Sequence, residues 1–238
     1  MNIHIIQHES FEDLGAIAVW IDRHGHTASI TKLDAGDVLP TSVADFELLI
    51  IMGGPQSPTT TLEECPHFDA KKEIAFIKKA IDHNKLVLGV CLGAQMIGEA
   101  YDARVEHSPH REIGLFPLTL TPAAKSDPFF ATLPQQIEAA HWHGDMPGVP
   151  KDAVILAESK GCPRQVIRYS DRVYGFQCHF EFDQPSVIGM LKHCAHELDD
   201  AGRLPYIQDA ETLRTNDYSS MNKMLFKFLD FMAEKNNK

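Results

Sequence analysis

The amino-acid sequence predicts an α/β fold: an open, mostly parallel sheet with helices on both faces, arranged as a flavodoxin-like three-layer sandwich. In the first half of the chain, short strand-like runs alternate with segments of helical periodicity. Two of the runs, 46–52 and 85–90, are mostly apolar, which is typical of strands buried on both sides. The second half has short strand candidates between loops rich in Pro and Gly, which favours a small antiparallel portion.

The first half is expected to begin with a strand at 3–6, IHII. Ser10, with Asp13 three residues later, can cap a helix whose apolar positions recur on one face until Gly25. The remaining first-half elements are strands at 27–33, 46–52 and 85–90, and a helix with Ala70, Ile74, Ile77 and Ile81 on one face. The last of these strands runs directly into Cys91.

The second half is expected to contain a β-hairpin made of 165–169 and 172–178 and joined by Ser170 and Asp171. This hairpin would place His179 at its far end. Three more strands are expected at 113–120, 137–142 and 153–157. A helix is expected from about Pro185 to Leu198.

Residues 208–235 are expected to form a terminal helical segment with a single apolar face. The residues of this face are Met221, Leu225, Phe228, Leu229 and Met232. We expect a main domain at 1–200 and a helical extension at 201–238 that packs on the same domain. A contact with a second copy of the chain, as in a homodimer, or with another partner is the alternative for the apolar face.

Composition and charge narrow the classes of function. Hydrophobic residues make up 44% of the 238 residues and charged residues 23%, as in globular proteins that bury a core. The formal charge of -11 argues against binding to nucleic acid or to anionic membrane surfaces, because both depend on clustered Lys and Arg. No segment resembles a signal peptide or a membrane span, and five widely separated cysteines suit reduced thiols, so a cytoplasmic location is expected.

The segment with the strongest chemical signal is Gly89-Val90-Cys91-Leu92-Gly93, at a predicted strand-to-helix turn. It is the sulfur counterpart of the G-x-S-x-G nucleophile elbow, in which a tight turn directs the nucleophile outward. The positive end of a helix dipole favours the reactive thiolate. The backbone N–H of Leu92 can form half of an oxyanion hole. An inert buried cysteine is the alternative for Cys91.

A cysteine nucleophile needs a base, and the base needs a group that orients it. His179 and Glu181 are two residues apart in an extended segment, so their side chains project from the same face and the carboxylate can fix the imidazole tautomer. Gly54, in the GGPQSP segment that follows a predicted strand, can direct its N–H at a substrate oxygen opposite Leu92.

Four segments in this order resemble the class I glutamine amidotransferase family, and most of all the glutaminase part of GMP synthase: GGPQSP, LGVCLGAQ, HWHGD at 141–145 and FQCHFE at 176–181. The resemblance covers roughly residues 1–195. It implies that Cys91 is the nucleophile, that His179 is the base and later the acid, and that Glu181 orients His179. It also implies an oxyanion hole at Gly54 and Leu92, and substrate contacts at Gln95, Gly144 and Asp145.

The sequence departs from the family pattern at two points. Phe180 stands where a proline commonly separates the catalytic His and Glu, although the spacing of His179 and Glu181 is kept. The chain also has no ATP-binding motif, so ammonia released from glutamine would go to a separate synthetase subunit.

Three functions remain open at this point. The first is hydrolysis of the glutamine side-chain amide, the second is γ-glutamyl peptidase activity with the same three residues, and the third is a non-catalytic binding or regulatory role. No cofactor and no metal are expected. His141 with His143, and His193 with His196, have spacings that can bind zinc, but no third and fourth ligands are evident. Pocket lining is expected for the first pair, and exposure on a helix for the second.

Overall fold

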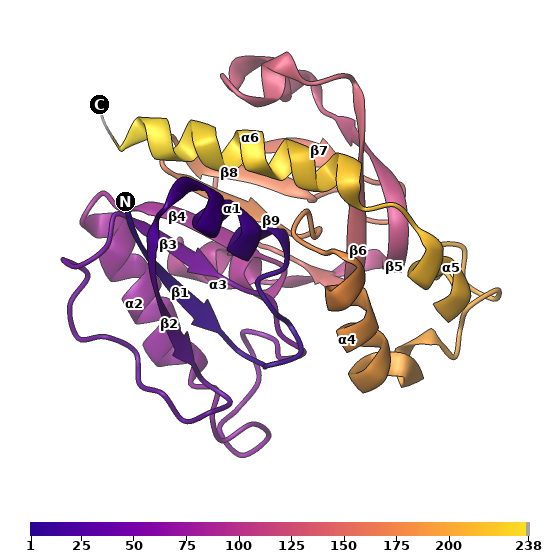
Figure 1. Ribbon diagram of the computed structural model, residues 1–238, viewed down its shortest axis with the longest axis horizontal. Helices are drawn as coiled ribbons and strands as arrows, with labels where there is room; N and C mark the ends of the chain where they lie inside the picture. Colours follow the sequence, from indigo (N-terminus) through magenta and orange to yellow (C-terminus); the bar gives the residue numbers. More distant parts are fainter. Residues whose placement is uncertain (237–238) are drawn as a thin grey trace.

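The computed structural model describes residues 1–236, which form one mixed sheet covered by helices (Figure 1). The strands are β1 Asn2–Gln7, β2 Thr27–Lys32, β3 Leu48–Ile51, β4 Leu86–Val90, β5 Glu106–Leu120, β6 Gln136–Met146, β7 Val154–Glu158, β8 Val166–Ser170 and β9 Val173–Phe176. The helices are α1 Ala16–His24, α2 Ala70–Asp82, α3 Leu92–Ala100, α4 Gln184–Cys194, α5 Ala210–Thr215 and α6 Ser219–Lys235. Short 3₁₀ helices lie at Pro122–Ser126, Phe130–Thr132 and Ala195–Leu198.

The strand order is β2-β1-β3-β4-β9-β8-β7-β5-β6. The first five strands are parallel to one another, and the pairs from β9 to β6 are antiparallel. Helices α2 and α3 cover one face, whereas α1 and α6 lie together on the other (Figure 1). The predicted three-layer α/β fold with a small antiparallel portion is therefore confirmed.

The two central strands, β4 and β9, position the candidate catalytic residues. β4 and β9 are parallel neighbours although more than 80 residues separate them along the chain. Parallel strands end at the same edge of a sheet, so the residues that follow β4 and β9 meet there. The N–H of Cys91 donates to the carbonyl of Phe176 at 2.7 Å, which ties the two strand ends together.

The first helix begins later than the sequence predicted. α1 starts at Ala16, and Ser10 lies in the preceding loop, where its N–H donates to the Asp34 side chain. The start is fixed by a distant segment: the N–H of Ala16 donates to the carbonyl of Glu181 at 2.8 Å. A Cβ at Gly15 would lie 2.2 Å from that same oxygen, and Gly15 has φ +45°. The prediction that Ser10 caps this helix was wrong, because a tertiary contact determines where the helix starts.

The C-terminal helical segment is divided into α5 and α6 by residues 216–218. All five apolar residues predicted for one face of it are buried in the core of the chain itself. The indole N–H of Trp20 in α1 donates to Asp230 in α6 at 2.8 Å. This face is therefore covered by the chain and is not available to a second copy. No helix within residues 1–236 is long and apolar enough to cross a bilayer.

Candidate active site

Cys91 occupies the sharp turn between β4 and α3. Its backbone has φ 50° and ψ −109°, a conformation that residues with a side chain rarely adopt and that must be held by its surroundings. A Cβ at Gly89 would lie 2.4 Å from the carbonyl carbon of Gly93, and a Cβ at Gly93 would lie 2.2 Å from the oxygen of Ile51. Packing thus requires both glycines that flank the cysteine.

His179 and Glu181 follow β9 and are buried. Nδ1 of His179 is 2.6 Å from Oε1 of Glu181, so the carboxylate holds this nitrogen as a donor. The backbone of His179 is fixed by two hydrogen bonds with Ala140 of β6, at 2.8 and 3.1 Å. Nε2 of His179 is buried and has no hydrogen-bond partner within residues 1–236, which leaves it free for the thiol or a substrate.

The thiol of Cys91 is almost fully enclosed. Its Sγ is 3.8 Å from the carbonyl oxygen of Trp142 in β6, and Nε2 of Gln177 donates to the sulfur at 3.4 Å. Burial raises the pKa of the Cys91 thiol, while the neighbouring His179 acts in the opposite direction. Burial also disfavours the imidazolium of His179, but Glu181 and Cys91 outweigh it and hold the pKa of His179 well above its usual value.

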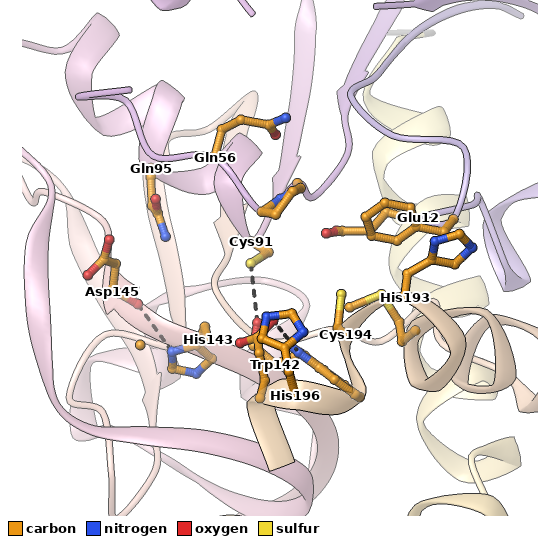
Figure 2. Close-up of a pocket in the computed structure, with 16 residues that line it drawn as sticks. Glu12, Gln56, Cys91, Gln95, Trp142, His143, Asp145, His193, Cys194 and His196 are labelled. Atoms are coloured by element: carbon orange, nitrogen blue, oxygen red, sulfur yellow. Dashed lines mark hydrogen bonds between the residues drawn. The ribbon is translucent and has the colours of Figure 1, made fainter. Parts of the chain in front are cut away.

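A pocket of about 610 Å³ opens over Cys91 (Figure 2). Of the residues that the sequence singled out, Gly54, Cys91, Gln95, Gly144 and Asp145 line it. His179, Glu181 and Leu92 are buried and are not among the residues that line it. The pocket falls in the size range that accommodates a ligand larger than one amino acid.

Two of the predicted substrate-contacting residues, Gln95 and Asp145, differ in whether their side-chain oxygens already have hydrogen-bond partners. Gln95 donates from Nε2 to Oε1 of Gln177, and its own Oε1 is buried without a partner within residues 1–236. A substrate N–H could satisfy this oxygen. Asp145 is already 2.6 Å from Nδ1 of His107, an exposed histidine. The Asp145 carboxylate therefore has a partner before any ligand binds.

The sequence did not reveal Glu12, which precedes α1 and lines the pocket on the side of Cys91 opposite Gln95 (Figure 2). Its side chain packs against Gly53, where a Cβ would lie 2.1 Å from Oε2 of Glu12 and 3.4 Å from the His179 ring. Burial raises the pKa of the Glu12 carboxyl to about 7, although the neighbouring His179 and His8 lower it. No local motif marks Glu12, since its role depends on contacts far along the chain.

We predict that Glu12→Gln makes the protein more stable at pH 8 and leaves its stability at pH 4.5 unchanged. The carboxyl pKa is higher in the folded state, so folding is penalised once this group ionises, and the penalty grows between about pH 4.5 and 7. The full penalty corresponds to about 3 kcal/mol. Urea unfolding at both pH values measures it, with the exposed Glu63→Gln as control. Equal stability of Glu12→Gln and parent at pH 8 would contradict the prediction.

The histidine pairs are placed in two ways. His193 and His196 are exposed, as predicted, and both line the pocket. His143 also lines it, but His141 lies behind the wall, so pocket lining was wrong for His141. No third ligand for this pair was evident in the sequence, but antiparallel pairing of β5 with β6 brings Glu112 to both histidines.

The fold and the pocket define a class of protein: an α/β protein in which a buried cysteine, at the turn after a central strand, lies beside a His-Glu pair. The family model described as glutamine amidotransferase class-I matches residues 12–193. The chain belongs to this family, which confirms the resemblance that its motifs indicated.

Individual relatives agree with this assignment. Glutamine amidotransferase-like protein YfeJ of Salmonella typhimurium is 45% identical over 230 residues, which are 97% of this chain and 96% of that protein. One subunit of the glutamine-hydrolyzing GMP synthase of Picrophilus torridus is 28% identical over 170 residues, which are 68% of this chain and 84% of its own length. The crystal structure of SMU.1228c has a TM-score of 0.95 and 45% identity, covering 98% of this chain and 100% of that chain.

Proposed function

We propose that the protein hydrolyses the side-chain amide of glutamine through a γ-glutamyl thioester on Cys91. In this mechanism the thiolate attacks the amide carbon, His179 protonates the departing ammonia, and His179 then removes a proton from the water that cleaves the thioester. The observation that carries the proposal is the placement of Cys91 at the elbow, at the floor of a pocket and beside a histidine whose Nδ1 is held by Glu181.

An oxyanion hole formed by Leu92 and Gly54 is supported by the way the Gly53-Gly54 peptide is held. Nδ1 of His8 donates to the carbonyl of Gly53 at 2.9 Å, and Nε2 of His8 pairs with the buried carboxylate of Glu73 at 3.0 Å. The peptide bonds described are all trans, so fixing the Gly53 carbonyl toward His8 turns the Gly54 N–H to the opposite side.

The matching donor comes from the helix. Leu92 is the first residue of α3, where backbone N–H groups have no partner inside the helix. A Cβ at Gly54 would lie 2.9 Å from the Leu92 side chain, so the two segments are in contact at the pocket floor. Two donors on either side of the space above Cys91 would stabilise the negative charge of both tetrahedral intermediates.

The rest of the pocket can hold the amino-acid end of the substrate. We assign Gln95, with its unpaired Oε1, together with Gly144 and Asp145, to the α-amino and α-carboxylate groups. Ammonia would pass to a separate synthetase chain. The relative from Picrophilus torridus supports this arrangement, because it is one of the subunits of a GMP synthase.

A γ-glutamyl peptidase activity is the second candidate. It uses the same acyl-enzyme and differs only in the group that leaves. One observation favours it: the pocket of about 610 Å³ is also lined by Phe11, Trp142, His193 and Glu197, and this volume gives room for a leaving group larger than ammonia.

Side-by-side assays separate the two activities and test the proposal. We expect the purified protein to release ammonia from glutamine and glutamate as the second product, and to leave asparagine intact because its carbonyl is one methylene short of the thiol. Preference for γ-glutamyl dipeptides over glutamine by kcat/KM would replace the first activity by the second. Turnover of neither substrate, whether the protein is alone or mixed with a synthetase partner, would favour a binding role.

A further inference from the structure

A cluster of buried polar side chains lies next to the pocket, and one of its members, His143, also lines the pocket. Glu112 comes from β5, His141 and His143 come from β6, and Gln165 immediately precedes β8. All four are at least 93% buried. We propose that these four residues form a binding site for one divalent transition-metal ion, for which Zn²⁺ is the best chemical match.

The distances among the candidate ligand atoms agree with tetrahedral coordination. Oε2 of Glu112 is 3.4 Å from Nε2 of His143 and 3.7 Å from Nδ1 of His141, and the two histidine nitrogens are 3.4 Å apart. Ligands at about 2.0–2.1 Å from a tetrahedral zinc ion lie about 3.3 Å from one another. The three atoms therefore surround a space of the right size with only small adjustments.

Gln165 has the position of a fourth ligand. Its Nε2 is 2.7 Å from Oε2 of Glu112, 3.2 Å from Nδ1 of His141 and 3.1 Å from Nε2 of His143. Oε1 of the same amide is buried and has no partner within residues 1–236. Rotating the amide by 180° exchanges the two atoms, so the unpaired oxygen would take the fourth vertex.

Hydrogen bonds around the cluster prepare two of the ligands. Nδ1 of His143 is 3.1 Å from the carbonyl of Asp145, which can only accept, so Nε2 of the neutral ring presents its lone pair to the cluster. Oε1 of Glu112 accepts from the N–H of Gly161, and Oε2 accepts from Ser159 at 2.7 Å. Metal ligands in proteins are commonly held by such outer contacts.

The alternative is a network of hydrogen bonds with no ion. In that network Nε2 of Gln165 brings two protons to one carboxylate oxygen, two imidazole nitrogens and the hydroxyl of Ser159. Even with a proton on Nδ1 of His141, the carboxylate of Glu112 is a buried charge beside two rings, with no cationic Lys or Arg paired to it in the described part of the chain. A cation satisfies these lone pairs together and compensates the buried negative charge.

The ion would support the active site without taking part in the reaction. It would join β5, β6 and Gln165 through His141 and His143, the two neighbours in the chain of Trp142, whose carbonyl contacts the Cys91 thiol. The neighbouring residue Ala140 holds the backbone of His179. His143 also lines the pocket, so an ion has an entry path.

Metal binding tests the site directly. Protein stripped with a chelator is titrated with Zn²⁺ alone and with Co²⁺ alone, in the parent and in Cys91→Ala, which removes the active-site thiol as a ligand. We expect one ion per chain in both proteins, an absorption spectrum of Co²⁺ typical of four nitrogen and oxygen ligands, and an increase in melting temperature on adding Zn²⁺. Absence of stoichiometric binding in the parent overturns the proposal.

Substitutions of the proposed ligands test where in the chain the ion binds. Glu112→Gln and His143→Gln keep the shape of the cluster, and each should weaken Zn²⁺ binding by about 10-fold or more. The control is Cys65→Ser, since Glu9, Cys65 and His67 form the other metal-compatible group found in the described part of the chain. Unchanged binding in Glu112→Gln and His143→Gln, or loss of binding in Cys65→Ser, assigns the ion elsewhere and overturns the proposal.

Discussion

Replacement of Cys91 by Ala is expected to reduce kcat for glutamine hydrolysis by about 10⁴-fold or more, which corresponds to about 5 kcal/mol of lost transition-state stabilisation. The reason is that Cys91 forms the covalent intermediate, and without it no group at the pocket floor can accept the γ-glutamyl unit. Steady-state ammonia release, followed over hours with excess protein, measures the residual rate. The fold should survive because a smaller side chain at this buried position opens little space.

A second thiol in the same pocket is the matched control. Cys194 is buried and lines the pocket wall, and burial together with the nearby carboxylates raises the pKa of its thiol to about 12. A glutamine analogue that carries an electrophilic ketone should add to Cys91 and leave Cys194 unlabelled in mass spectra. Cys194→Ala should keep the activity within a few-fold. Labelling of Cys194, or full activity of Cys91→Ala, would refute the assignment of the nucleophile.

Glu181→Gln should lower kcat by about 10²- to 10⁴-fold while changing KM little. The amide preserves the shape of the side chain but removes the charge that holds Nδ1 of His179 as a donor at 2.6 Å. The pKa of His179 is held high by Glu181, so it should fall in the variant. Because His179 must carry a proton when ammonia leaves, the alkaline limb of kcat/KM against pH should move to lower pH.

The Glu12→Gln variant separates the effect of a hydrogen bond that orients His179 from the effect of a negative charge near His179. Both carboxyl groups are buried near His179, but only Glu181 makes a hydrogen bond to the ring, and Glu12 affects it through charge. We expect a much smaller loss of kcat for Glu12→Gln. If the losses were reversed between the two variants, Glu12 would be the residue that positions the histidine.

Several elements could be predicted because they depend on neighbours within a few residues. The strand at 85–90, the glycines on both sides of Cys91 and the helix from Ala70 follow from apolar periodicity and from steric limits on a tight turn. The start of α1 could not be predicted in this way, since it depends on the carbonyl of Glu181, more than 160 residues later.

The sequence by itself determined the α/β class, the elbow at Cys91 and the spacing of His179 and Glu181, because backbone sterics and side-chain alternation act over short distances. Only the tertiary structure decided which residues surround them. The pairing of β4 with β9 brings Cys91 to the histidine, and the pairing of β5 with β6 brings Glu112 to His143. The order of strands in a sheet depends on how all the apolar faces are buried together, so no single segment encodes these contacts.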